Sequence, residues 1–584
     1  MRTIMEFATR SPAVLPPIGN GELSLQIDPE GAMSPEFGLK SICPVSNWQG
    51  MVPGIRRAGW RWGGDHRAGR ELFPFGFFTQ ELPGRGEPSR RRLTFDTDLA
   101  EVVSEISWAD GTVLTTEIFC HATENLVAIR KRASAPVPFC FHHHPEHRRL
   151  TMKPRKPGLW DCIYDLDEIR EEPFALFACG PGFTPEENGL LWRGTLTGCV
   201  WILAWGEAAI RKAGNLSFEE LRREHRAAWA AFYKRSTPPL LPTRMKRSYD
   251  MALYHLKIST TRWSVPTGLF DSHWHGRFFA FDELFILRGL LCAGCFEEAR
   301  RIPAFRIATF ERARQRECKD ARGDGSCFYP LETLEDGSEG APAGFWLDHV
   351  FHNANVALCI AEYAKCSGDM RILEQGGKEV IRSCALFFER HMLYECGGRT
   401  ILGSCTDMER LGEHRRNAFM TTCAAIALFR IAAEFAGSPA DAGRYRDLAQ
   451  RLEAGLPVEN GRFVAYPGGP AASIGLLGGF YPYAVLSPQN ELAQAALDSF
   501  IASERQVGNM YDTGNSVCAW YRLWKCMACL YAGRRETAEN ELDLLLSETG
   551  SWGELFEIYE KSMRPFFATA EGIFLSLLHQ LYKP

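Results

Sequence analysis

The stretch Asp271–Gly289 combines residue types that bind sugars. It contains several aromatic rings, two histidines and a carboxylate pair, and its candidate site residues are Trp274, His275, Phe281, Asp282 and Glu283. Aromatic faces stack on the apolar faces of pyranose rings, whereas carboxylates and imidazoles exchange hydrogen bonds with hydroxyl groups. A second interpretation is an ordinary helix start with phenylalanines in the core, because aromatic clusters at helical spacing are typical of packing. This stretch alone does not decide between the two.

Three long connections in the second half of the chain concentrate further polar and aromatic residues. They span Asp320–Gly344, Gly397–Arg416 and Glu548–Pro565. Connections beyond roughly 12 residues without secondary structure are usually functional. We therefore take as candidate site residues Tyr329, Glu332, Glu409, Arg410, Trp552, Glu554 and Glu557, together with Trp346 just beyond the first connection.

Length, charge and hydropathy exclude several classes of protein. A chain of 584 residues exceeds one hydrophobic core and predicts several domains. The formal net charge of -5 provides no broad basic field, so nucleic acid is not an expected partner. Met1–Leu15 has no secretory pattern and no apolar run is long enough to span a bilayer, so we expect neither export nor a membrane partner.

The cysteine pattern favours reduced thiols in the cytoplasm. Nineteen cysteines are scattered along the chain, which is untypical of a disulfide framework. The pairs Cys292/Cys295 and Cys526/Cys529 could together bind zinc, but both lie in apolar helical runs. The run His142–His147 is a second possible metal cluster, although a polar strand end or loop explains it more simply. We expect no metal and no cofactor.

Two contrasting patterns divide the chain. Residues 1–215 contain short β-branched and aromatic segments separated by turns, which predicts an antiparallel β-sandwich with Pro83–Arg92 and Pro136–Pro157 as exposed connections. Residues 216–242 form a helical linker that opens with the cap Ser217 and early glutamates and ends at a proline pair.

Residues 243–584 are predicted to be helical throughout. Helices that are apolar all round, such as Phe419–Ala436, alternate with amphipathic ones such as Asp441–Leu456, which indicates an inner and an outer ring. We count about twelve helices, the eighth over 474–484, and expect an (α/α)6 toroid. No repeated sequence period supports this arrangement, so an α-solenoid is the structural alternative.

The order of these parts resembles glycoside hydrolase family 65 and its inverting relatives, including glucoamylases. The linker motif Ser217–Trp229 and the segment His275–Phe285 are similar to family elements, the second to a Gly-x-x-x-Trp-Asp-x-Glu region that lines the sugar pocket. Gly325–Pro330 and His349 are similar to further elements. Phe281 stands where the family has tryptophan, and this difference puts glucose as the substrate in question.

The resemblance also selects the catalytic carboxylates. Thr406–Arg410 resembles the family turn that carries the general acid, which implies that Glu409 is the acid; a solvated glutamate paired with a nearby arginine is the alternative. An inverting hydrolase needs a second carboxylate to activate water. Phe556–Tyr559 resembles a base-bearing Glu-x-Tyr turn, which implies that Glu557 is the base, with Glu554 as the alternative.

We therefore expect an inverting, exo-acting glycoside hydrolase that acts on an oligosaccharide or glycoside. Many family 65 members are phosphorylases, and that is the first alternative; Glu571 would place a repulsive charge near the family's phosphate site, which favours hydrolysis. A non-catalytic sugar-binding protein on the same fold is the second alternative. A homodimer is one assembly that we consider, because the sequence does not determine the oligomeric state.

Overall fold

The fold is described from a computed structural model of the chain, which divides into two compact units. The first contains residues 1–236, 257–261 and 268–276, and the second contains 237–256, 262–267 and 277–584. The structure describes residues 2–7, 14–33, 54–57, 72–144, 150–156, 159–164, 171–178, 183–186, 189–268, 276–316, 323–341, 343–407, 413–503, 519–558 and 563–583.

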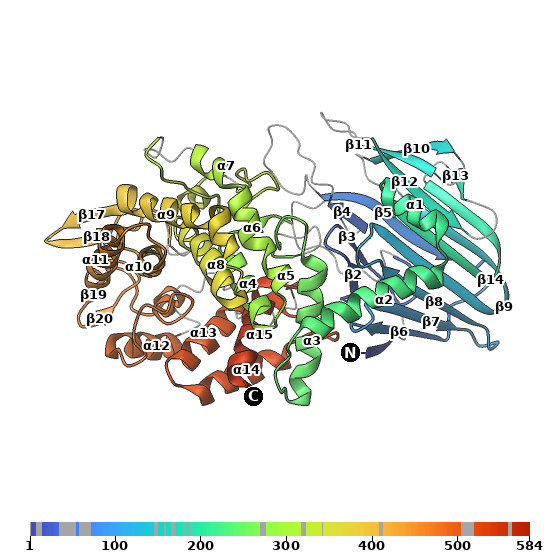
Figure 1. Ribbon diagram of the computed structural model, residues 1–584. Helices are drawn as coiled ribbons and strands as arrows, with labels where there is room; N and C mark the ends of the chain where they lie inside the picture. Colours follow the sequence, from blue (N-terminus) through green and yellow to red (C-terminus); the bar gives the residue numbers. More distant parts are fainter. Residues whose placement is uncertain are drawn as a thin grey trace. The chain divides into compact units, whose positions relative to one another are not determined.

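The first unit is built on an antiparallel sheet of 14 strands, which confirms the predicted antiparallel N-terminal architecture (Figure 1). The strands are β1 (Arg2–Phe7), β2 (Pro17–Gly19), β3 (Leu23–Gln26), β4 (Gly54–Arg57), β5 (Leu72–Glu81), β6 (Arg90–Asp96), β7 (Glu101–Ser107), β8 (Val113–Cys120), β9 (Leu126–His144), β10 (Leu150–Lys156), β11 (Leu159–Tyr164), β12 (Glu171–Ala178), β13 (Thr184–Glu186) and β14 (Gly189–Trp205). The main path runs from β1 through β6–β9 and β14 to β12, β11 and β10, and β5 joins through β9.

The segment after β3 covers one face of β7–β9, so this part of the sheet is two layers deep. Ser104 donates a hydrogen bond to the carbonyl of Pro29 at 2.6 Å. The buried ammonium of Lys131 donates to the carbonyl of Gly31, also at 2.6 Å. Burial lowers the pKa of Lys131 to about 7.

Strand β9 runs through a region that the sequence predicted to be an exposed connection. Pro136 and Pro138 lie inside β9, and Pro138 pairs with Thr195 of β14. On the other side, β8 pairs only as far as Ala133 and β5 pairs only from Cys140 onward. The prediction was wrong because proline, which donates no backbone hydrogen bond, is tolerated where a strand has a neighbour on one side alone.

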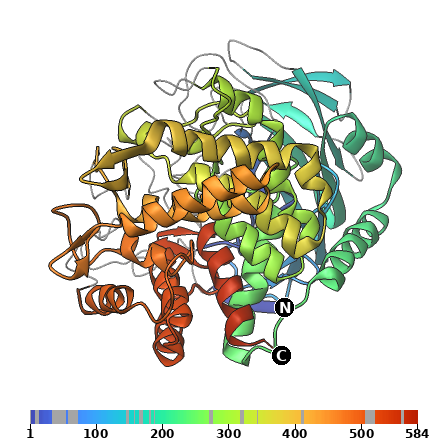
Figure 2. The ribbon, with the colours of Figure 1, turned by 60° about the vertical axis from the view of Figure 1, so that its left-hand side comes forward.

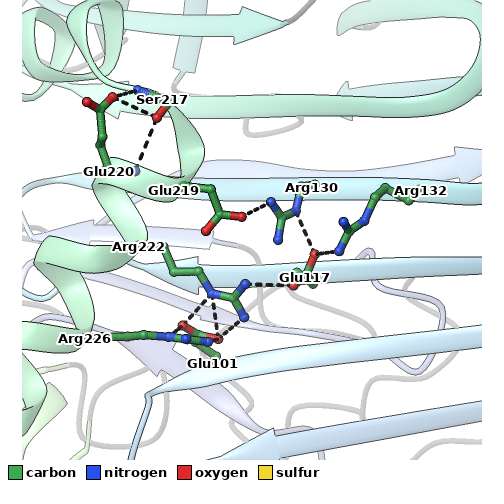
Figure 3. A network of polar contacts seen from close by, with 9 residues as sticks. All are labelled: Glu101, Glu117, Arg130, Arg132, Ser217, Glu219, Glu220, Arg222 and Arg226. Carbon is green, nitrogen blue, oxygen red and sulfur yellow. Dashed lines mark hydrogen bonds and ion pairs between the residues drawn. The ribbon is translucent and has the colours of Figure 1, made fainter.

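Helices α1 (Glu207–Asn215) and α2 (Phe218–Arg235) pack against β8, β9 and β14. The predicted cap is present, since Ser217 and Glu220 form a reciprocal capping box. Five charged residues then clamp α2 onto the sheet: Arg222 and Arg226 donate to Glu101, and Arg222 and Arg130 donate to Glu117 (Figure 3). We call Glu101, Glu117, Arg130, Arg222 and Arg226 the α2 clamp.

The second unit contains a closed ring of inner helices, which confirms the predicted toroid over the solenoid alternative (Figure 1 and Figure 2). The inner elements are α4 (Asp282–Cys292), α8 (His352–Ser367), α10 (Phe419–Glu434), the 3₁₀ helix η5 (Ile474–Gly479), α13 (Ala519–Tyr531) and α15 (Ala568–Leu581). Each contacts the next in this order, and α15 contacts α4.

The outer elements alternate with the inner ones along the chain. They are α3 (Thr243–Ser259), the series α5 (Phe296–Ala299), α6 (Arg301–Ala308) and α7 (Phe310–Gln315), then α9 (Lys378–Phe387), α11 (Pro439–Ala454), α12 (Glu491–Ser503) and α14 (Arg535–Ser547). Three short hairpins each precede an inner element: β17 (Leu393–Cys396) with β18 (Arg399–Leu402), β19 (Val458–Glu459) with β20 (Arg462–Phe463), and β21 (Phe556–Ile558) with β22 (Met563–Pro565). Strands β15 (Phe278–Phe279) and β16 (Glu332–Thr333), which lie on either side of α4–α7 in the chain, also pair with each other.

One predicted helix is shorter than expected. The segment 474–484 forms only η5 and then turns, because Gly478 and Gly479 favour irregular backbone and Pro482 cannot continue a helix. None of the helices within the described ranges is long and apolar enough to cross a membrane.

Two glycines allow the first and last inner helices to approach closely. A Cβ atom on Gly289 of α4 would lie 2.6 Å from the backbone oxygen of Gly572 in α15. A Cβ atom on Gly572 would lie 2.4 Å from the backbone oxygen of Phe285. The ring therefore closes through a contact that no larger residue could make without separating the helices.

Candidate active site

Asp282 is the first residue of α4, and a residue of the last helix fixes its orientation. The hydroxyl of Thr569, in the first turn of α15, donates a hydrogen bond to Asp282 Oδ1. Burial raises the pKa of Asp282 to about 7; the Thr569 hydrogen bond opposes this rise, and the charge of Glu557 adds to it. The carboxylates of Asp282 and Glu557 therefore lie within electrostatic reach of each other.

The hairpin β21–β22 carries Glu557, and Glu554 lies just before it. Both side chains are buried, with 2% and 1% of their surface exposed. Glu554 accepts a hydrogen bond from the amide of Trp552 at 2.9 Å, and its Oε1 has no hydrogen-bond partner among the described residues. Burial raises the pKa of Glu554 to about 7. Since both carboxylates are inside the protein, burial alone does not choose the base.

An aromatic cluster surrounds Phe281, the residue before Asp282. Its ring centroid lies 5.1 Å from Phe285, 5.1 Å from Phe351 and 5.9 Å from Trp520. These rings come from the starts of α4, α8 and α13. The half-buried Phe281 thus packs in an aromatic cluster beside Asp282, and its role in a sugar pocket stays a prediction.

The connection that contains Glu409 is held at both ends. Cys405 and Arg415 exchange backbone hydrogen bonds of 3.1 and 2.8 Å. Asp407 is buried, and its Oδ1 accepts hydrogen bonds from the amide and hydroxyl of Thr421 in α10. Burial raises the pKa of Asp407 to about 6. Glu409 and Arg410 lie outside the described residues.

Several other predicted residues are engaged with protein groups. Glu283 and Arg306 form a buried ion pair at 2.6 Å. The hydroxyl of Tyr329 donates to the backbone of Arg306, also at 2.6 Å, and Glu332 pairs with Arg277. Their contact with substrate stays a prediction.

The remaining predicted residues differ in their surroundings. Trp552 is buried, whereas Trp346 is half-buried beside Phe345, with the two ring centroids 4.4 Å apart. Trp274 and His275 lie outside the described residues. His349 is buried, and burial lowers its pKa to about 4.

Sequence reasoning did not select Thr569, His255 or Asp407 as site residues, and it considered Glu571 without its partner His255. His255 Nδ1 lies 2.6 Å from Glu571 Oε2, and both side chains are fully buried. The signal for Thr569 and Glu571 was available, since they are the polar residues in the otherwise apolar first half of α15. No group of three or more metal-ligating side chains occurs within the described part of the chain.

Comparison with known proteins finds a family model that matches part of the chain. Residues 250–440 match the model of the glycosyl hydrolase family 65 central catalytic domain. A kojibiose phosphorylase of Halothermothrix orenii is 28% identical over 209 residues, which cover 32% of this chain and 26% of that protein. The matched part is thus about a quarter of the relative's length.

Two solved structures share the fold over nearly the whole chain. A putative kojibiose phosphorylase from the human microbiome has a TM-score of 0.64 at 11% identity, covering 97% of this chain and 85% of that one. A bacterial glucoamylase complexed with acarbose has a TM-score of 0.59 at 11% identity, covering 100% and 98%. Residues 250–440 are therefore similar to the central catalytic domain of glycosyl hydrolase family 65, and the fold over nearly the whole chain is similar to that of the putative kojibiose phosphorylase and the bacterial glucoamylase.

Proposed function

We propose that this chain cleaves a terminal glycosidic bond with inversion and transfers the sugar to inorganic phosphate, with Glu409 as general acid. The observation that carries the proposal is the sequence similarity to a kojibiose phosphorylase, together with the match of residues 250–440 to the family 65 catalytic domain. In this reaction the acid protonates the leaving oxygen while phosphate attacks the opposite face of the sugar. Kojibiose, the disaccharide in that relative's name, is the first substrate to test.

The contacts of Glu571 remove our main objection to phosphate. The sequence suggested that this carboxylate would repel the anion. Glu571 instead lies fully buried against His255, and the nearby imidazole opposes the rise in its pKa that burial causes. We therefore expect the carboxylate of Glu571 to interact with His255 rather than with phosphate.

Hydrolysis is the second candidate, and the position of Glu557 favours it. Glu557 and Asp282 already disfavour each other's charge, so a phosphate dianion beside them would add repulsion. A water molecule would not, and Glu557 could take its proton as general base. Glu557 would therefore promote hydrolysis but would oppose the binding of phosphate.

The decisive experiment incubates the protein with kojibiose and a panel of other disaccharides, with and without inorganic phosphate. We expect a sugar phosphate that forms only when phosphate is present, and NMR should show a first-formed anomer opposite to that of the substrate. Free sugar formed without phosphate would support hydrolysis. If no product formed from any substrate, a non-catalytic sugar-binding protein would be the remaining interpretation.

Variants of the two glutamates separate the reactions further. Glu409→Gln should lower turnover by about 10²–10⁴-fold in either case, since this is the usual contribution of a general acid. Glu557→Gln should abolish hydrolysis, whereas in a phosphorylase it should lower KM for phosphate because a repelling charge is gone. Loss of activity in Glu554→Gln but not in Glu557→Gln would transfer the base role to Glu554.

We propose the cytoplasm as the location. Fourteen cysteines within the described ranges are free thiols, which is compatible with a reducing compartment.

A further inference from the structure

Glu554 and Glu557 are buried carboxylates only three residues apart, but their surroundings differ. Glu554 Oε2 accepts a hydrogen bond from the backbone amide of Trp552 at 2.9 Å. Burial is the largest influence on the pKa of Glu554 and on that of Asp282. The neighbouring charge that acts on Glu554 is Arg247 of α3, whereas the charges that act on Asp282 include Glu557. Glu554 is thus folded back onto its own connection, and Glu557 is the carboxylate within reach of Asp282.

The turn before β21 is organised around Glu554. The amide of Gly550 donates to the backbone carbonyl of Glu554 at 3.1 Å, and the amide of Gly553 donates to the carbonyl of Gly550 at 2.9 Å. With the bond from the Trp552 amide to the carboxyl group, Glu554 accepts two of the three hydrogen bonds that close the turn.

Gly550 provides the space that the carboxyl group of Glu554 occupies. A Cβ atom on Gly550 would overlap this carboxyl group. The φ angle of Gly550 lies outside the left-handed region, so the backbone conformation does not require glycine there. Glu554 is only 1% exposed and has little room to move aside. The two positions therefore fit together as a pair.

The turn joins α14 to β21, and contacts on both sides of Glu554 hold it. A Cβ atom on Gly553 would lie 3.0 Å from the backbone of Arg247 in α3. The carbonyl of Leu555 accepts a hydrogen bond from the amide of Phe567, just before α15, at 3.2 Å. Glu557 follows two residues later, within β21. The conformation of the turn therefore sets where the backbone of Glu557 lies.

We propose that Glu554 is a positioning residue whose carboxyl group, as a hydrogen-bond acceptor, sets the turn before β21 and so keeps Glu557 within electrostatic reach of Asp282. Glu554 is then not the general base. This inference rests on the proposed function, in which Asp282 and Glu557 belong to the active site. A misplacement of about 1 Å can cost about 10²-fold in rate, so the turn affects catalysis although Glu554 does not act on the substrate.

Two substitutions of Glu554 separate positioning from proton transfer. Glu554→Gln keeps an acceptor for the Trp552 amide and nearly the same shape, but it cannot take a proton as a carboxylate does. It should keep most of the wild-type kcat/KM on the disaccharide that the protein uses best. Glu554→Ala removes the acceptor and should lower kcat/KM by about 10²-fold. Equal losses of this size in both variants would overturn the proposal, because a general base contributes about 10²–10⁴-fold.

Gly550→Ala disturbs the same contact without changing Glu554. The added methyl group should displace the carboxyl group and reproduce the loss seen in Glu554→Ala. In the double variant the methyl group meets no carboxyl group, so Gly550→Ala should add little to the loss caused by Glu554→Ala. Fully additive losses would show that the two residues act independently and would contradict the proposal.

The pH profile of kcat/KM reports whether Glu557 has moved away from Asp282. Burial and the charge of Glu557 raise the pKa of Asp282, so removal of that charge to a greater distance should lower this pKa. In Glu554→Ala the acid limb of the profile should therefore move to lower pH, whereas Glu554→Gln should leave it in place. An unmoved limb in Glu554→Ala, despite its lower kcat/KM, would overturn the positioning role.

Amide hydrogen exchange over residues 550–558 tests the turn whether or not the protein cleaves sugar. Exchange there should become faster in Glu554→Ala and stay unchanged in Glu554→Gln, with circular dichroism to check that both variants are folded. Unchanged exchange in Glu554→Ala would overturn this inference and leave the proposed function intact. A wild-type protein that cleaves no disaccharide would overturn the proposed function, and exchange would still decide whether Glu554 sets the turn.

Discussion

At the start of α4, where burial raises the pKa of Asp282, the hydroxyl of Thr569 lowers it, whereas the carboxylates of Glu557 and Glu283 raise it further. Burial and Glu557 favour the protonated form, whereas the Thr569 hydrogen bond favours the ionised form. The resulting pKa of about 7 lies where enzymes usually work, so small changes in this balance alter the charge of Asp282 at neutral pH. Its ability to accept a sugar hydroxyl depends on that charge.

Replacing Thr569 by valine should therefore weaken sugar binding in a pH-dependent way. Loss of a hydrogen bond to a charged group costs about 1.5–3 kcal/mol, so kcat/KM should fall by about tenfold or more. Because the lost bond favoured the ionised form, the pKa of Asp282 rises and the acid limb of the pH profile of kcat/KM moves to higher pH. Thr569→Ser keeps the hydroxyl and should keep the wild-type profile. An unshifted limb in the valine variant would contradict this account.

Glu554 should make the stability of the protein depend on pH. Its pKa is about 7 in the folded chain and 4.5 without perturbation, so the folded state binds the proton more tightly. Stability is then greatest below pH 4.5 for this group, and falls by about 3 kcal/mol as the pH rises to 7 and above. Glu554→Gln should flatten that slope. Thermal unfolding midpoints of both proteins between pH 5 and 8 measure the difference, and parallel curves would show that Glu554 is not the cause.

At the scale of elements, the α2 clamp joins a helix to a sheet, a contact that the periodicity of each segment does not predict. Glu101 is 4% exposed and receives hydrogen bonds from both Arg222 and Arg226 (Figure 3). These hydrogen bonds hold its pKa below the ordinary value although burial opposes them. The stabilisation is therefore present at neutral pH and is lost as the pH falls through the folded-state pKa.

Glu101→Gln should release α2 from the sheet, because two arginines lose their buried partner. Breaking a buried ion pair costs about 3–5 kcal/mol, and amide hydrogen exchange should become faster along α2. Glu219→Gln is the matched control on the same helix, since the Glu219 side chain is 63% exposed and its pair with Arg130 is worth about 0–1 kcal/mol. Equal destabilisation of the two variants would show that burial of the clamp does not matter.

The order and type of most elements could be predicted from the sequence. The apolar helix at Phe419 and the capped helix at Ser217 lie where periodicity and capping residues placed them. Local patterns failed where tertiary surroundings decide: Pro138 is in a strand because β9 has one neighbour there, and η5 is fully buried although its glycines disfavour a regular helix. These outcomes depend on partners that are distant in sequence.

Closure of the inner ring is the feature of the helical unit on which the site depends. Asp282 and Thr569 belong to the first and last inner helices, and Gly289 and Gly572 let those helices touch. The sequence predicted Asp282 as a site residue but gave no reason to pair it with Thr569. The pairing of Asp282 with Thr569 follows only from closure of the ring, and no sequence repeat predicts that closure.

Gly289→Ala should open the ring at this contact. The new methyl group would meet the backbone of α15, and overpacking of this kind costs about 1–3 kcal/mol, with loss of activity through separation of Asp282 from Thr569. Gly443→Ala is the control, because Gly443 lies in outer helix α11 with nothing within 4 Å of the added atom. That variant should gain about 0.5–1 kcal/mol from helix propensity. Denaturant unfolding and disaccharide cleavage would measure both, and a stable, active Gly289→Ala would contradict the closure argument.

The hydrogen bond between Asp282 and Thr569 spans 287 residues of chain. A ribosome adds roughly 5–20 residues each second, so on the order of tens of seconds pass between synthesis of the two partners. During that time the nascent chain holds α4 without the helix that packs against it in the folded protein. A product truncated before α15 would therefore lack the last inner helix and the partner of Asp282, so the proposed activity would require that synthesis be completed.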